Sequence, residues 1–250
     1  MRSERVSLRA WGLSEQRVPG GKLLCDSCLG RSLGVCRPLD DQRLGQLLAM
    51  GGQRRWAKRE FLYRADDPVQ MLYKITKGIV AESRMLADGR RQIVGIRTIG
   101  DLCGYPDHQG RHLFSAEAHT EVEACAFERT RFHALLGRHI DLACALAEDT
   151  AQRLKRATEN MTVIGQLKST ERVAHFLVEI FALYARHPIG PQVQMLHFTR
   201  QEIADYLGLT LETVSRSFSK LRDLHVIALV GGDSVAILNE QELSSIAKVS

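Results

Sequence analysis

The sequence predicts an α+β fold built from four consecutive regions: an arm (1–40), a strand-rich roll or sandwich (41–137), a long helix (138–168) and a helical region with a terminal hairpin (169–250). Two observations support this order. Apolar runs before residue 137 are short and are separated by turn residues, whereas apolar residues after it recur every three or four positions. Segregation of strands from helices is typical of α+β proteins.

The chain has 250 residues, of which 44% are hydrophobic, and this fraction excludes a wholly disordered protein. Its net charge of +5 permits an anionic partner. No apolar run approaches the roughly 20 residues that span a bilayer, and the start lacks a secretion signal. We therefore expect a cytoplasmic protein, in which cysteines bind metals or perform redox chemistry rather than form disulfides.

The strand-rich region contains the runs "EFLY", "MLYKI", "GIVAES" and "EVEACAF", and Asp88-Gly89 between two runs predicts a hairpin. In the last run, the alternation of strand side chains places Val122, Ala124 and Ala126 on one face. Cys125 lies on the opposite face, away from the plain apolar side.

The long helix is predicted by a stripe of small and apolar residues at spacings of three and four. The stripe consists of Leu142, Leu146, Thr150, Leu154, Ala157, Met161 and Ile164. A long helix with such a narrow apolar stripe usually packs against a partner helix. We therefore expect a homodimer, although packing of the helix on its own domain is the alternative.

A helix-turn-helix is predicted by "FTRQEIADYLGLTLETVSRSFSKLRDLHVI". Thr199 and Glu202 form a capping-box pattern, Gly208 permits a left-handed turn, and Thr210 can cap a second helix. The runs "VIALV" and "VAIL" on either side of Gly231-Gly232-Asp233 predict a hairpin that serves as the wing.

The second helix has a polar face suited to the major groove of DNA. Arg216 can donate two hydrogen bonds to guanine, Glu212 can accept from cytosine, and Ser215 can serve either kind of edge. Arg200, Lys220 and Arg222 are better suited to phosphates. The predicted DNA-binding residues are Arg200, Thr210, Glu212, Thr213, Ser215, Arg216, Ser219 and Lys220.

Three of the six cysteines lie in the arm, as "CDSCLGRSLGVC". The spacing of Cys25, Cys28 and Cys36 is typical of a metal or redox site. The pattern alone does not distinguish between these.

The stretch "TRQEIADYLGLTLETVSR" closely resembles the recognition motif of the Crp/Fnr family of bacterial transcription regulators, and "EFLYRADDPVQMLYKITKGIV" and "IGDLCGY" resemble its cyclic-nucleotide-binding-type β-roll. The resemblance runs from about Cys25 to the C-terminus. It implies a homodimer that binds a palindrome with TTGAT-like half-sites and contacts RNA polymerase. One departure is Asp66-Asp67, where the family often has Gly-Asp. Asp tolerates the left-handed conformation that such a turn requires.

The Fnr-type branch of the family senses oxygen through a [4Fe-4S] cluster. The resemblance implies that Cys25, Cys28, Cys36 and Cys125 hold the cluster here. Three local thiolates and a remote one suit such a cluster better than structural zinc, which favours two close cysteine pairs. We do not expect cyclic-nucleotide binding, because Phe114 precedes Ser115 where the phosphate-pairing arginine of the cyclic-AMP sensors stands.

Two alternatives remain open. The cysteines could bind zinc or act as a thiol redox sensor of nitric oxide or peroxide in a regulator of the same family. A metal-cluster redox protein without DNA binding is the other. No substrate-binding signature appears, so we do not expect an enzyme.

Overall fold

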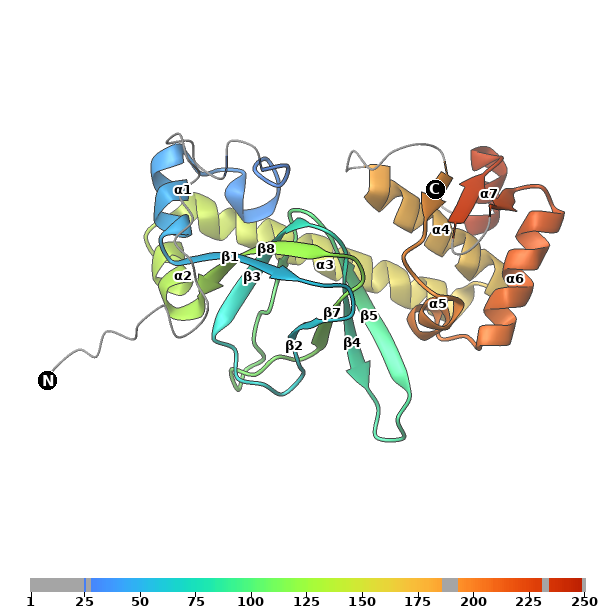
Figure 1. Ribbon diagram of the computed structural model, residues 1–250, viewed down its shortest axis with the longest axis horizontal. Coiled ribbons are helices and arrows are strands. Elements are labelled where there is room, and N and C mark those ends of the chain that lie inside the picture. The colour runs from blue at the N-terminus through green and yellow to red at the C-terminus, as the bar shows by residue number, and fades with distance from the viewer. Residues whose placement is uncertain (1–24, 26–27, 186–192, 231–233, 249–250) are drawn as a thin grey trace, which may run out of the picture. The chain divides into compact units, whose positions relative to one another are not determined.

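The computed structural model describes residues 25, 28–185, 193–230 and 234–248. It has the predicted α+β fold (Figure 1). The contacts divide it into two compact units. One contains the described residues up to Val80 together with Arg97–Ala151, and the other contains Ala81–Ile96 and the described residues from Gln152 onward.

The strand-rich region forms two four-stranded sheets, of order β1-β8-β3-β6 and β2-β7-β4-β5. The strands are β1 (Gly51–Trp56), β2 (Phe61–Tyr63), β3 (Met71–Lys77), β4 (Val80–Met85), β5 (Arg91–Arg97), β6 (Leu102–Cys103), β7 (Ser115–Ala118) and β8 (Val122–Glu128). The predicted hairpin at Asp88-Gly89 joins β4 and β5, and Gly89 has a positive φ. Asp66 adopts the left-handed conformation, with φ of 67°.

The predicted alternation along β8 is present, but the face that carries Cys125 also packs in an apolar core, which the sequence did not predict. Val122, Ala124 and Ala126 pack in the core between the sheets, which also contains the fully buried Cys103. The opposite face of β8 carries Cys125 and Phe127 into a second core. In the β-ladder Cys125 lies opposite Gln53 of β1 and Lys74 of β3.

The second core is covered by short helices that the sequence reading missed. These are a 3-10 helix (Gly34–Cys36), α1 (Asp41–Leu48) and α2 (Arg129–Leu136). The prediction of an irregular arm up to residue 40 and a purely strand-rich region after it was therefore incomplete. Asp40 and Glu128 cap α1 and α2 by accepting hydrogen bonds from backbone amides. Residues 1–24 lie outside the described residues.

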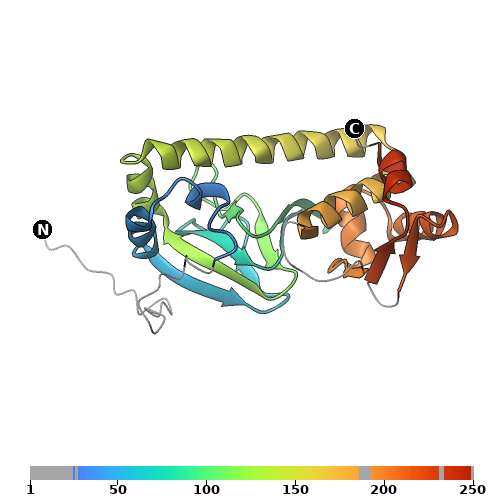
Figure 2. The same cartoon turned by 90° about the horizontal axis from the view of Figure 1, so that it is seen from above.

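The long helix α3 spans Ile140–Gln166, close to the predicted range, and Figure 2 shows it uninterrupted. The first stripe residue, Leu142, is buried in the second core, whereas Leu154 and Met161 are 69% and 73% exposed. Three threonine hydroxyls on the helix, those of Thr150, Thr158 and Thr162, bond to carbonyls four residues earlier. The middle of the stripe, from Thr150 to Met161, is thus exposed, whereas its two ends are partly or fully buried.

The C-terminal region contains α4 (Ser169–Ala185), β9 (Val193–Met195), α5 (Arg200–Leu207), α6 (Leu211–Asp223), β10 (Ile227–Leu229), β11 (Ser234–Ile237) and α7 (Glu240–Ala247). The capping box of Thr199 and Glu202, the left-handed Gly208 and the Thr210 cap are all present. Strands β10 and β11 pair as the predicted wing, and β9 extends the sheet in the order β10-β11-β9. The tip 231–233 and the predicted loop 186–191 lie outside the described residues.

The prediction that the chain ends in two strands was wrong, because α7 follows β11. Asn239 caps this helix by accepting a hydrogen bond from the amide of Glu242. The Asn-x-x-Glu pattern was a usable signal for the helix start. Among the described residues, no helix combines the length and apolar character that crossing a membrane requires.

Candidate functional site

The four predicted cysteine ligands line one pocket within the second core. Cys25, Cys28 and Cys36 come from the N-terminal loop, and Cys125 comes from β8. Arg31 and Lys74 line the same pocket, whose cavity measures about 20 Å³. The fold thus brings together residues that lie far apart in the sequence.

Turns and one arginine shape the loop that carries three of these cysteines. The amide of Cys28 donates to the carbonyl of Cys25 at 3.2 Å. The guanidinium of Arg31 donates to the carbonyl of Cys36 at 2.7 Å and also to that of Leu39. Arg31 therefore links the middle of the loop to its end. No pattern in the sequence indicated this role for Arg31.

Glycines let this loop approach the turn between β5 and β6. Gly34 has φ of 53°, and a Cβ on it would lie 2.5 Å from the carbonyl oxygen of Gly100. A Cβ on Gly100 would in turn lie 2.6 Å from that of Leu33. Because such contacts are too short for real side chains, both positions need glycine.

Burial makes the thiols poor acids. It raises the pKa of Cys25 to about 11 and that of Cys125 to about 12, and the neighbouring cysteines add to both shifts. Burial also raises the pKa of Cys36, although Lys74 opposes the shift. These three thiols are therefore protonated at neutral pH. A metal that binds these thiols must therefore displace their protons. A thiol that acts as a redox sensor needs a lowered pKa, whereas the pKa values here are raised.

The donor set fits a four-thiolate metal centre. The described residues contain no group of three or more His, Cys, Asp or Glu side chains already arranged around one metal position. The fit therefore rests on the donor chemistry and on the shared pocket. Metal ligation would therefore require the loop to move.

The polar face of α6 is exposed as predicted. Glu212, Ser215, Arg216 and Lys220 are exposed, and Val214, Phe218 and Leu221 are buried. The hydroxyls of Thr210 and Thr213 lie 3.0 Å apart at the start of the helix, and Arg216 donates to the hydroxyl of Thr213 at 3.4 Å. Hydrogen bonds from its own amide and from Thr210 lower the pKa of Glu212, so this carboxylate is charged.

Three of the predicted DNA contacts, Arg200, Thr213 and Ser219, are half-buried, whereas the other five are exposed. Arg200, at the start of α5, has its guanidinium 3.3 Å from the centre of the Phe218 ring. Stacking on an aromatic ring orients a guanidinium without neutralising it. Arg200 thus contributes to packing, and its predicted phosphate contact remains a prediction.

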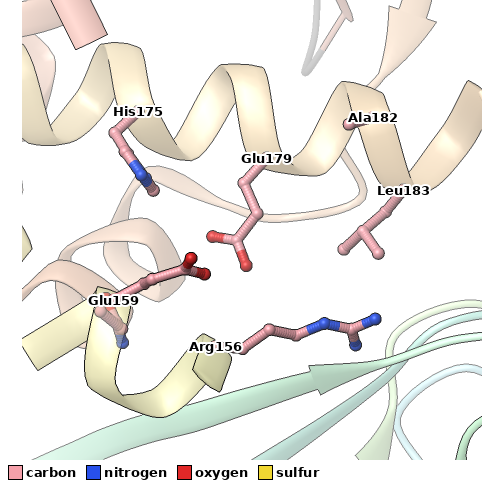
Figure 3. Close-up of a pocket in the computed structure, with 7 residues that line it drawn as sticks. Arg156, Glu159, His175, Glu179, Ala182 and Leu183 are labelled. Carbon is pink, nitrogen blue, oxygen red and sulfur yellow. The ribbon is translucent and has the colours of Figure 1, made fainter. Parts of the chain in front are cut away.

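A further pocket of about 180 Å³ lies between α3 and α4, and none of the predicted site residues lines it. Glu179 and His175 of α4 extend toward Glu159 and Arg156 of α3 (Figure 3). Tyr206 donates a hydrogen bond to the Glu179 carboxylate at 3.0 Å. Burial nevertheless raises the pKa of Glu179, with a contribution from Glu159, while Tyr206, His175 and Arg156 oppose the shift.

Replacing Arg216 by alanine should relax base specificity at the guanine it reads, at a cost of about 1–3 kcal/mol. Arg222→Ala on the same helix should weaken binding equally for all sequences, because phosphate contacts carry no base information. Fluorescence anisotropy with a TTGAT-like palindrome and its single-base variants measures both effects. An equal loss of affinity for all DNA sequences in the Arg216→Ala variant would contradict direct readout of a base by Arg216.

Replacing Gly34 by alanine should destabilise the folded protein by about 1–3 kcal/mol, because the new Cβ meets the Gly100 carbonyl and φ is left-handed. Amides of the loop, such as those of Arg37 and Leu39, should also lose protection from hydrogen exchange. Gly45→Ala in α1 is the control, since its Cβ meets nothing within 4 Å. It should stabilise the helix by about 0.5–1 kcal/mol. Equal changes in stability for the two variants would be inconsistent with close packing of Gly34 on the Gly100 carbonyl.

Replacing Glu179 by glutamine should raise the thermal midpoint more at pH 8 than at pH 4. A raised native pKa means that the folded state holds the proton more tightly, so ionisation destabilises the fold as pH rises through that pKa. Glutamine keeps the acceptor for Tyr206 but cannot ionise. Glu242→Gln is the control, because that carboxylate is exposed on α7 and does not line this pocket. A pH-independent difference for Glu179→Gln would rule out this account.

Comparisons with known proteins match both folded parts of the chain. Residues 53–139 match a cyclic nucleotide-binding domain, and residues 171–246 match a Crp-like helix-turn-helix domain. FixK2 from Bradyrhizobium japonicum is a similar solved structure, with a TM-score of 0.71 and 31% identity over 79% of this chain and 98% of that one.

Curated relatives cover most of the chain. The nitrogen fixation regulation protein FixK of Bradyrhizobium diazoefficiens is 33% identical over 89% of this chain and 93% of its own. The transcriptional activator FnrL of Cereibacter sphaeroides is 33% identical over 85% of this chain and 87% of its own. The fumarate and nitrate reduction regulatory protein of Vibrio cholerae is 27% identical over 92% and 93%. The chain is thus a member of the Crp/Fnr family of DNA-binding transcription regulators.

Proposed function

We propose that the protein is an Fnr-type regulator that responds to oxygen through a [4Fe-4S] cluster on Cys25, Cys28, Cys36 and Cys125. The observation that carries the proposal is the convergence of these four thiols on one pocket in the second core. When bound, the cluster supplies a centre that oxygen can destroy. FixK and FnrL are similarly close relatives, so the cysteines rather than relatives' names support the proposal.

The cysteine loop is linked to the start of α3. Cys36 shares the second core with Leu142, and Leu146 packs against that core. Arg37 pairs with Glu148, and Arg43 pairs with Asp141, both on α3. A change in the loop therefore alters the packing of the first turns of the helix.

The exposed part of the stripe fits a second copy of the chain. Leu154 and Met161 are exposed, and the intervening Ala157 is small. Two such helices would bury these side chains against each other. We therefore propose a homodimer whose two α6 helices contact successive major grooves, about 34–36 Å apart, in a TTGAT-like palindrome. Contact with RNA polymerase is the proposed output.

Thiolate ligation ties the loop to β8 and hence supports one packing of α3. Loss of the metal centre leaves protonated thiols that no longer join the two segments. The dimer equilibrium can respond only if the centre binds more tightly in the dimer than in the monomer. Zinc on the same thiolates is the second candidate, since it uses the same donor set.

Protein purified without oxygen should contain iron and acid-labile sulfide, absorb in the visible region and bind a TTGAT-like palindrome. Air exposure should remove both the absorbance and the binding. Cys125→Ser should lack the cluster and the oxygen response, because the loop loses its connection to β8. Cys144→Ser is the matched control, since that thiol is exposed and does not line the pocket.

Zinc without sulfide in the anaerobic protein would support the second candidate instead. A Cys125→Ser variant with a normal oxygen response would refute the proposed ligand set.

A further inference from the structure

Lys74 is among the largest fully buried side chains of the described residues, with 1% exposure. It lies on β3, directly opposite Cys125 of β8. It lines the same pocket as the four cysteines. The sequence indicated only weakly that this lysine is buried. It interrupts the otherwise apolar run "MLYKI", and the alternation of strand side chains places it on the same face as the apolar Leu72.

The contacts of Lys74 are with the cysteine loop. Its Nζ donates to the carbonyl of Gly30 at 2.5 Å, and its proximity lowers the pKa of the Cys36 thiol against the effect of burial. A Cβ on Gly30 would lie 3.2 Å from Nζ, so glycine permits this approach. Among the described residues, no carboxylate pairs with Lys74.

A buried ammonium is costly unless an anion compensates it. The groups in this pocket that can become anionic are the cysteine thiols. In their protonated form they offer little compensation. Four thiolates on a metal centre would instead bring several negative charges into an apolar core, where one neighbouring cation is strongly favourable.

We propose that Lys74 is the counter-charge of the cysteine site, a positioning residue that retains the metal centre and raises its reduction potential. This inference rests on the proposed function. A positive charge beside the ligand sulfurs favours the more negative, reduced form of a cluster. The bond to Gly30 also holds the loop against the sheet.

Lys74→Met provides the sharpest test, because methionine is unbranched and of similar length but uncharged. In the metal-free protein the variant should be as stable as wild type or more stable, since an apolar side chain suits an apolar core. In the anaerobically loaded protein it should release iron to a chelator about 10–100-fold faster, the usual cost of losing an outer-shell partner. Its midpoint potential should fall.

Two variants serve as controls. Lys77→Met changes an exposed lysine on the same strand, which pairs with Glu121. It should change neither the rate of iron release nor the midpoint potential. Lys74→Arg keeps the charge and should restore much of the retention and the potential. Thermal unfolding of each metal-free variant separates these effects from misfolding.

The possible failures are distinguishable. Wild-type protein that takes up no iron and sulfide contradicts the proposed function and this inference together. Loaded Lys74→Met protein with the wild-type potential and iron release contradicts this inference alone. A Lys74→Met variant that loses stability equally with and without the cluster assigns Lys74 a purely structural role and also overturns the inference.

Discussion

The packing of one face of β8 is the constraint on which the N-terminal, strand-rich part depends. Cys125 and Phe127 project from this face into a core that also receives Cys36 from the N-terminal loop and Leu142 from α3. Three segments distant in the sequence therefore share one set of contacts. Cores are close-packed, so a change in any of these segments must be accommodated by the others. Packing by itself would then be enough for a thiolate centre at this position to influence α3.

Polar groups inside this core are held by a small number of specific bonds. Arg31 donates to carbonyls of the cysteine loop, and Lys74 donates to the carbonyl of Gly30. Such groups are expensive to bury and are retained where they give a unique geometry or a function. The raised pKa values of Cys25 and Cys125 belong to the same environment. A pocket that buries protonated thiols disfavours separate thiolates, and under the proposed function a metal would neutralise them jointly.

The DNA-reading part depends on different physics. Its turn and caps are satisfied within a few residues: Thr199 with Glu202, Gly208 in the left-handed conformation, and Thr210 with Thr213. Val214 and Phe218 anchor α6, which leaves Arg216 on the exposed face. Such local determination explains why this part was predicted almost completely from the sequence, apart from β9 and α7.

The sequence by itself determined the features that local spacing encodes. These are the α+β order, the long helix, the hairpin at Asp88-Gly89, the helix that reads DNA, and the placement of Cys125 on the face of β8 opposite Val122, Ala124 and Ala126. Only the tertiary structure decided which segments meet. The opposition of Lys74 and Cys125 depends on the register between β3 and β8, and the approach of Gly34 to Gly100 depends on loop docking. The stacking of Arg200 on Phe218 depends likewise on how α5 packs on α6. Local patterns specify which face a side chain occupies, but its partner is set by long-range packing, which no short window of sequence contains.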